Sequence, residues 1–159
     1  MIRDLTGADL PYIRVLIDAT DLFPSSLLDE MVQQFLGGNE AKEIWLVLTN
    51  PQSVGVAYVA PEKLTDGTFN LLLIAIHPAE QGKGFGAQLI AEVENRLKEL
   101  GARILLVETS GLEGFALTRR FYLKNGYELE GRIRDFYQDG DDKVILRKVL
   151  TWNPSAPLS

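Results

Sequence analysis

The residues best suited to chemistry lie in a glycine-rich run, Gln81-Gly82-Lys83-Gly84-Phe85-Gly86, which Ala87 follows. Six apolar residues, 71–76, come before it and predict a strand buried on both faces. The apolar spacing over residues 89–100 predicts a helix that begins at the glycines. The start of a helix offers unpaired N–H groups and a positive dipole end, and glycines let an anion approach the backbone. The run therefore predicts a site for a phosphate or pyrophosphate.

Two familiar phosphate-binding motifs fit this run poorly. A P-loop would require glycine in place of His77 and serine or threonine in place of Gly84. The dinucleotide fingerprint can be laid over Gly82, Gly84 and Ala87, but its first glycine follows the strand almost at once. Here residues 77–81 intervene, and Pro78 is among them. A connection without any ligand is the remaining alternative, although each of three glycines at a helix start costs about 0.5–1 kcal/mol relative to alanine.

The run resembles the Gln/Arg-x-x-Gly-x-Gly/Ala signature of the GNAT superfamily of acyl-CoA-dependent N-acetyltransferases. A second block, Phe121-Tyr122-Leu123-Lys124-Asn125-Gly126-Tyr127, resembles that family's Phe/Leu-Tyr-x-x-x-Gly-Phe motif. The resemblance implies acetyl-CoA as the co-substrate. Its pyrophosphate would lie on the glycine run and its pantetheine arm along the preceding strand. The residues expected to bind it are Ile74, Ala75, Ile76, Gln81, Gly82, Lys83, Gly84, Phe85, Gly86 and Ala87.

The resemblance also suggests catalytic and acceptor-binding residues. In the family, the tyrosine matched by Tyr122 brings its hydroxyl to the sulfur of coenzyme A. Glu108 resembles a glutamate of the branch that acetylates ribosomal proteins and other protein N-termini, where it would act as a base. Ile133-Arg134-Asp135-Phe136-Tyr137 is similar to a run of that branch, which places Phe136 and Tyr137 at the acceptor site. On residue type alone, Tyr122 could instead be a core aromatic and Glu108 a surface acid.

The elements that must position these residues follow the family's order, β-α-α-β-β-β-α-β-α-β-β, over about residues 1–150. This order implies one domain of the α/β (α+β) class, with a mixed, mostly antiparallel sheet, a central parallel and splayed strand pair, and flanking helices. The strand at 71–76, its helix and the strand at 103–108 supply the parallel pair. An apolar stripe of Ile13, Leu16 and Ile17 marks the first helix. Residues 151–159 are expected to form a flexible tail.

The composition of the chain excludes several kinds of site and partner. With 159 residues the chain suits one domain with a full core. Zero cysteines and one histidine exclude disulfides, a thiol acyl-enzyme and a multi-histidine metal site, so no metal is expected. No membrane-spanning run or signal peptide is evident, which favours a cytoplasmic protein without a membrane partner. The net charge of −6 argues against nucleic acid and favours a cationic partner. We expect a monomer or a homodimer.

The combined expectation is an N-acetyltransferase that moves an acetyl group to a primary amine, on a small molecule or a peptide N-terminus. The amine would attack directly in a ternary complex, since the chain has no cysteine to form an acyl-enzyme. Acids near the last predicted turn, Asp135, Asp139, Asp141 and Asp142, would suit a cationic acceptor. The main alternative is a non-catalytic acyl-CoA-binding regulatory module, and a weaker one is a nucleotide-binding regulator. Tyr122 favours the enzyme, because a binding module needs no proton donor there.

Overall fold

The structure is a computed structural model that describes residues 1–38 and 42–150. These fall into two compact units. The first unit comprises Met1–Pro61 and Leu71–Asn95, and the second comprises Glu62–Asn70 and the described residues from Arg96 onward. The predicted order of helices and strands is confirmed. A single domain over residues 1–150 stays a prediction, and the predicted tail at 151–159 lies outside the described residues.

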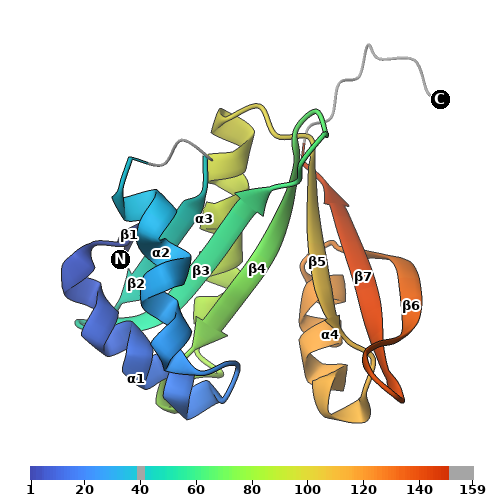
Figure 1. The fold of residues 1–159 in the computed structure, drawn as a ribbon, viewed down its shortest axis with the longest axis horizontal. Helices are drawn as coiled ribbons and strands as arrows, with labels where there is room; N and C mark the ends of the chain where they lie inside the picture. Colours follow the sequence, from blue (N-terminus) through green and yellow to red (C-terminus); the bar gives the residue numbers. More distant parts are fainter. Residues whose placement is uncertain (39–41, 151–159) are drawn as a thin grey trace. The chain divides into compact units, whose positions relative to one another are not determined.

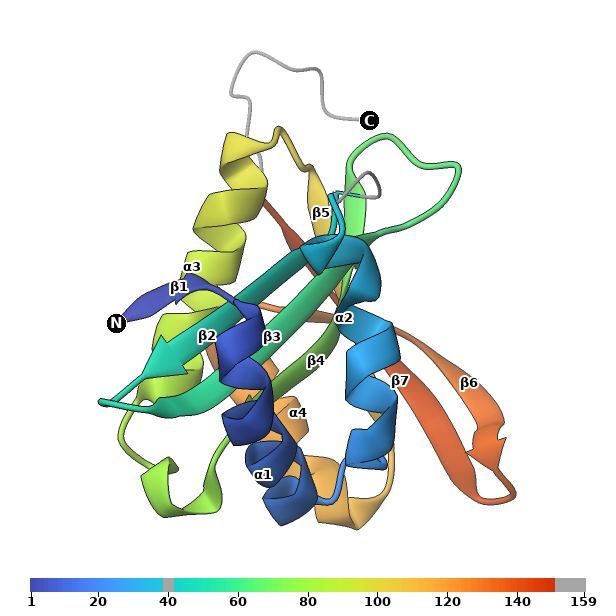
Figure 2. The same cartoon turned by 60° about the vertical axis from the view of Figure 1, so that its left-hand side comes forward.

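Four strands run side by side in the first unit. They are β1 (Ile2–Asp4), β2 (Ile44–Thr49), β3 (Ser53–Pro61) and β4 (Thr68–Ile76), neighbours in that order, and the part of β4 from Leu71 onward belongs to this unit. β2 pairs antiparallel with β1 and with β3, and the hairpin between β2 and β3 is seen in Figure 2. Trp45 lies opposite Tyr58, and Val47 lies opposite Val56. Cross-strand pairs share a face, so these residues form one apolar surface.

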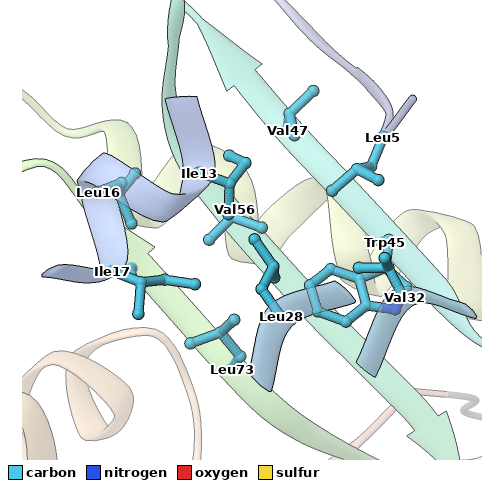
Figure 3. Close-up of a cluster of buried hydrophobic side chains, with 11 residues drawn as sticks. Leu5, Ile13, Leu16, Ile17, Leu28, Val32, Trp45, Val47, Val56 and Leu73 are labelled. Carbon is cyan, nitrogen blue, oxygen red and sulfur yellow. The ribbon is translucent and has the colours of Figure 1, made fainter. Parts of the chain in front are cut away.

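Helices α1 (Leu10–Thr20) and α2 (Leu28–Leu36) cover that surface, while α3 (Phe85–Glu99) lies on the opposite face (Figures 1 and 2). The predicted stripe of Ile13, Leu16 and Ile17 is confirmed, because all three are fully buried. Figure 3 shows them with Leu28 and Val32 of α2 against Trp45, Val47, Val56 and Leu73 of the strands. Among the residues that the structure describes, no helix has both the length and the apolar character needed to cross a membrane.

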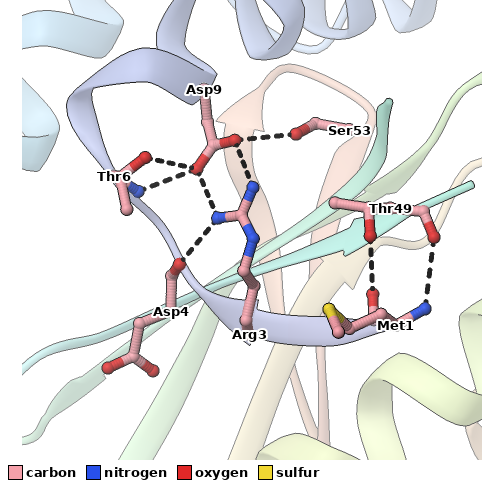
Figure 4. Close-up of polar contacts among 7 residues, drawn as sticks. All are labelled: Met1, Arg3, Asp4, Thr6, Asp9, Thr49 and Ser53. Atoms are coloured by element: carbon pink, nitrogen blue, oxygen red, sulfur yellow. Dashed lines mark hydrogen bonds and ion pairs between the residues drawn. The ribbon is translucent and has the colours of Figure 1, made fainter. Parts of the chain in front are cut away.

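An ion pair joins the start of α1 to the strands (Figure 4). The two guanidinium nitrogens of Arg3 contact the two carboxylate oxygens of Asp9, each at 2.8 Å. The same carboxylate accepts hydrogen bonds from the Thr6 backbone N–H at 2.8 Å and from the Ser53 hydroxyl at 3.0 Å. The Arg3 contact, above all, holds the pKa of buried Asp9 well below its usual range. Asp9 therefore fixes where α1 begins relative to β1 and β3.

The burial of β4 differs from the prediction. Leu71, Leu73 and Ala75 are buried, whereas Leu72 is 52% exposed and Ile74 and Ile76 are half-buried. The expectation of a strand buried on both faces is therefore wrong. α1 and α2 cover the face of Leu73 and Ala75, and alternation sends residues 72, 74 and 76 to the other, less covered face. An apolar run alone does not reveal that one face stays accessible.

The second unit contains β5 (Ile104–Ser110), β7 (Asp141–Val149) and β6 (Glu128–Gln138), antiparallel and in that order, with helix α4 (Ala116–Lys124). The first residues of β4 also belong to it and lie beside β5. The Gly67 carbonyl accepts bonds from the backbone N–H groups of Arg103 and Ile104, and farther along Asn70 reaches Glu108. Residue numbers therefore increase in the same direction along both strands, from Gly67 to Asn70 on one side and from Arg103 to Glu108 on the other. The two strands are parallel here, as predicted. The predicted mixed, mostly antiparallel α/β class is confirmed.

Strand β6 is exposed almost along its whole length. Its pairing with β7 shifts register between Ile133 and Gln138, and Asp135 in that interval has a positive φ of 55°. The Asp135 carboxylate accepts a bond from the Gly140 N–H at 2.8 Å, and the Asp142 carboxylate accepts one from the Asp135 N–H at 2.9 Å. These two acids hold the bulge and the turn of the β6–β7 hairpin.

Candidate functional site

The glycine run forms an open loop before α3. β4 ends at Ile76, a short 3-10 turn spans Pro78–Glu80, and α3 begins at Phe85. Gly82 and Gly84 have φ angles of 80° and 82°, which favour glycine, and a Cβ on either would meet no atom within 4 Å. The loop backbone is therefore accessible beside the unpaired N–H groups of the first helical turn. This arrangement fits a pyrophosphate, which bonds to backbone N–H groups at a helix start.

Side chains of the loop brace it from within. The Gln81 amide donates to the Ile76 carbonyl at 3.0 Å, and Lys83 pairs with Glu80 at 2.8 Å. The sequence predicted that the Gln81 amide and the Ile76 backbone bind the cofactor, whereas here these two groups bond to each other. Their direct roles stay predictions. The Lys83 pair is exposed and contributes little, so its charge remains available to an anion.

Tyr122 combines a packed ring with a protonated hydroxyl. It is 4% exposed, and its ring meets those of Phe121 and Tyr127 edge-on, at centroid distances of 5.2 and 5.6 Å. Burial raises the pKa of Tyr122 above its usual value near 10. The hydroxyl therefore keeps its proton at neutral pH and has a hydrogen to donate there. Tyr122 is thus a core aromatic, as the simpler interpretation held, and remains a candidate proton donor.

The three residues predicted at the acceptor side lie around one cation. Glu108 on β5 forms an ion pair with Lys143 on β7, at 2.9 Å between Oε2 and Nζ. The same Nζ lies 3.6 Å from the centroid of the Phe136 ring, which packs edge-on against Tyr137 at 5.1 Å. Burial, and then the negative charges of Glu108 and Asp141, raise the pKa of Tyr137. The structure thus brings Glu108, Phe136 and Tyr137 together.

Sequence reasoning missed the two residues that hold Glu108. Besides Lys143, the Asn70 amide donates to Oε1 of Glu108 at 2.9 Å and to Glu62 at 3.0 Å. Asn70 is 4% exposed, and its own oxygen has no hydrogen-bond partner among the residues that the structure describes. Both carboxylate oxygens of Glu108 are therefore engaged. The only sequence signal was a polar residue, Asn70, directly before the apolar run of β4.

The acids of the β6–β7 hairpin serve the hairpin itself. Asp142 pairs with Arg132 at 2.7 Å, Asp141 accepts a bond from the Ser110 hydroxyl at 2.5 Å, and Asp135 holds the turn. Three of the four acids that the sequence suggested for a cationic acceptor thus have partners in the chain. Within residues 1–38 and 42–150, no group of three or more His, Asp or Glu side chains is placed to hold a metal ion.

Known proteins resemble this chain in sequence and fold. A family model described as an acetyltransferase (GNAT) domain matches residues 40–129. A structure from Desulfovibrio desulfuricans, described as an acetyltransferase of the GNAT family, is 31% identical with a TM-score of 0.88, over 95% of this chain and 99% of that one. The Escherichia coli ribosomal-protein-S18-alanine N-acetyltransferase is 20% identical, with a TM-score of 0.78 over 100% and 99% of the two chains. A Salmonella typhimurium protein solved with acetyl-CoA is 17% identical, with a TM-score of 0.78 over 98% and 96%. No curated protein matches the sequence.

Proposed function

Because the chain belongs to the GNAT acetyltransferase family, we propose that it transfers the acetyl group of acetyl-CoA to a primary amine by direct attack in a ternary complex. The observation that carries this proposal is the primary ammonium group of Lys143, which lies between the Glu108 carboxylate and the Phe136 ring. A site that holds an ammonium group beside a candidate base has the chemistry that an amine acceptor requires.

The glycine loop is the proposed cofactor site. Acetyl-CoA supplies an activated acetyl thioester. The backbone of residues 82–87 would hold its pyrophosphate, with bonds that contribute about 1.5–3 kcal/mol each when charge-assisted, and Lys83 would add a positive charge. The strand backbone near Ile74 and Ile76 would bind the pantetheine arm. The open Cβ positions of Gly82 and Gly84 support this assignment, because an anion can reach the backbone there.

Glu108 is the proposed base. An amine must be neutral to attack, and a lysine-type amine with a pKa of about 10.4 is neutral roughly once in a thousand at pH 7.4. Glu108 would accept the ammonium proton, directly or through water, while Asn70 keeps the carboxylate oriented. Tyr122 would donate a hydrogen bond or its proton to the departing thiolate, whose free pKa is about 8.5. Its buried, protonated hydroxyl suits that task.

The proposed acceptor is a peptide N-terminus or a small primary amine. An α-amino group with a pKa of about 8 is neutral roughly one time in five at pH 7.4, so it depends less on the base. The run at residues 133–137 resembles the branch that acetylates protein N-termini. The E. coli neighbour, named for a ribosomal-protein alanine, supports the same choice.

A panel of primary amines and N-terminal peptides tests the proposal. Each would be incubated with the protein and acetyl-CoA, and released thiol and acetylated product would be measured. We expect transfer to at least one amine, with a lower kcat for Glu108→Gln. If acetyl-CoA binds by calorimetry but no amine is acetylated, the non-catalytic acyl-CoA-binding alternative is correct.

A further inference from the structure

We propose that Glu108 and Phe136 form an ammonium-binding subsite of the acceptor site, that Lys143 occupies it as an internal competitor, and that the acceptor's primary ammonium group displaces Lys143. This inference rests on the proposed function and deepens it, because it names the chemical class that the subsite takes, a primary alkylammonium. It also gives a role to Lys143, which takes part in none of the proposed catalytic steps.

The contacts of Lys143 are those that an alkylammonium ligand would make. Its Nζ lies 2.9 Å from Oε2 of Glu108 and 3.6 Å from the centroid of the Phe136 ring. A carboxylate and an aromatic face both attract a cation, and the attraction grows as water is excluded. The side chain of Lys143 is 14% exposed and that of Glu108 is 25% exposed. The subsite is therefore sheltered, yet it remains in contact with solvent.

Glu108 and Phe136 each have a contact that does not depend on Lys143. Asn70 holds Glu108 through the other carboxylate oxygen, and Tyr137 packs against Phe136. Phe136 is itself 49% exposed and lies on β6, a strand exposed almost throughout. An ion pair that served only the core would not need a ring left open to solvent. The ring gives an incoming ligand access to the subsite.

Exchange of Lys143 for another primary ammonium conserves charge and contacts. The ligand replaces one ion pair and one cation–π contact with equivalent ones, while the flexible stem of Lys143 moves its charge into water. Asn70 also joins the carboxylate of Glu62 to that of Glu108, so a second negative charge lies beside the ion pair of Glu108 and Lys143. A hydroxyl group or an anion cannot replace Lys143, because neither brings a positive charge to the Glu108 carboxylate and the Phe136 ring.

Occupation by Lys143 weakens acceptor binding in proportion to the fraction of time that the subsite is free. If Lys143 fills it for about nine-tenths of the time, the apparent Kd of the acceptor rises about tenfold, which equals about 1.4 kcal/mol. Lys143 would thus set the acceptor KM of the enzyme.

Binding of n-butylammonium to the full chain tests the subsite, followed by NMR in the absence of acetyl-CoA. Lys143→Met removes the charged head and keeps an apolar stem, whereas Lys143→Arg keeps a resident cation as a matched control. We expect Lys143→Met to bind about tenfold more tightly than the wild type, and Lys143→Arg to bind within about twofold of it. Adding Glu108→Gln to Lys143→Met should abolish the gain, and n-butanol should not bind. Equal affinities for the wild type and Lys143→Met, at normal circular dichroism, would overturn the inference.

Acetylation of n-butylamine then tests whether the subsite belongs to the acceptor. We expect Lys143→Met to lower the KM for n-butylamine by about the same factor as the Kd. Tighter binding with an unchanged KM would overturn the inference, because the ammonium would then bind away from the reacting amine. If peptides are acetylated but n-butylammonium shows no gain, the inference fails and the proposed function stands. If no amine is acetylated although the binding gain and its loss with Glu108→Gln are seen, the proposed function fails and the ammonium subsite stands without its role in transfer.

Discussion

Substitution of Tyr122 by phenylalanine separates chemistry from packing at the most buried candidate residue. The ring contacts with Phe121 and Tyr127 at 5.2 and 5.6 Å are retained, and only the hydroxyl is lost. No hydrogen bond to that hydroxyl is formed by the residues that the structure describes. We therefore expect the free energy of unfolding to change by less than about 1 kcal/mol. Tyr122→Ala, which also deletes the ring, should cost about 3–5 kcal/mol.

The effect of Tyr122→Phe on the rate should be modest. General acids typically contribute about 10²–10⁴-fold, but a thiolate is already a good leaving group, so we expect kcat to fall about tenfold, or about 1.4 kcal/mol in the activation barrier. Affinity for acetyl-CoA should not change. The pKa of Tyr122 is raised by burial, so the wild type keeps its donor between about pH 6 and 9. The ratio of the two kcat values should therefore stay constant over that range.

The same raised pKa has a consequence for stability. The folded state holds the Tyr122 proton more tightly than the unfolded state, whose pKa is near 10. The contribution of the Tyr122 proton to stability is therefore fully present below about pH 10 and is lost as the pH rises further.

Rates with an accepted amine, calorimetry with acetyl-CoA and thermal unfolding would be measured side by side for the wild type and Tyr122→Phe. A Tyr122→Phe protein with wild-type kcat at every pH would refute a chemical role for the hydroxyl.

Three further substitutions test the loop, the base and the anchor of α1. Gly84→Asp should abolish most of the affinity for acetyl-CoA, measured by calorimetry. Gly140→Asp is the control, because Gly140 has a similar φ of 81° and equally open space, and it should keep that affinity. Equal affinities of the two variants for acetyl-CoA would refute the loop assignment. Glu108→Gln should lower kcat/KM about 10²–10⁴-fold for an alkylamine and less for a peptide N-terminus, whose amine is more often neutral; an equal loss for both would argue against a base. Asp9→Asn should destabilise by about 1–3 kcal/mol in urea unfolding at pH 7. Because the pKa of Asp9 is lowered in the folded state, the contribution of its carboxylate to stability is complete above about pH 4 and is lost in acid. The difference in unfolding free energy between the wild type and Asp9→Asn should therefore shrink at pH 3. A difference that stays constant with pH would contradict this account.

Local patterns predicted most of the fold. The spacing of Ile13, Leu16 and Ile17 predicted the buried stripe of α1, and the strand–helix–strand order predicted the parallel start of β4 and β5. The sequence did not show that Leu72 is accessible, because an apolar residue type does not reveal whether its face of the sheet is covered. Contacts between distant residues were also hidden. Asn70, Glu108 and Lys143 meet only because β4, β5 and β7 align, and no spacing along the chain encodes that register.

The bulge of β6 bears on how the proposed acceptor subsite could change while the candidate catalytic side chains stay the same. Asp135, at a φ of 55°, shifts the register just before Phe136. Side chains alternate between the two faces of a strand, so a slip of one residue would turn Phe136 away from Lys143. A single insertion or deletion in this hairpin would therefore remove the aromatic side of the proposed subsite and leave Glu108 and Tyr122 in place. Hairpin length, rather than the identity of the reacting residues, is then the quantity that evolution could vary to redirect such an enzyme to a different amine.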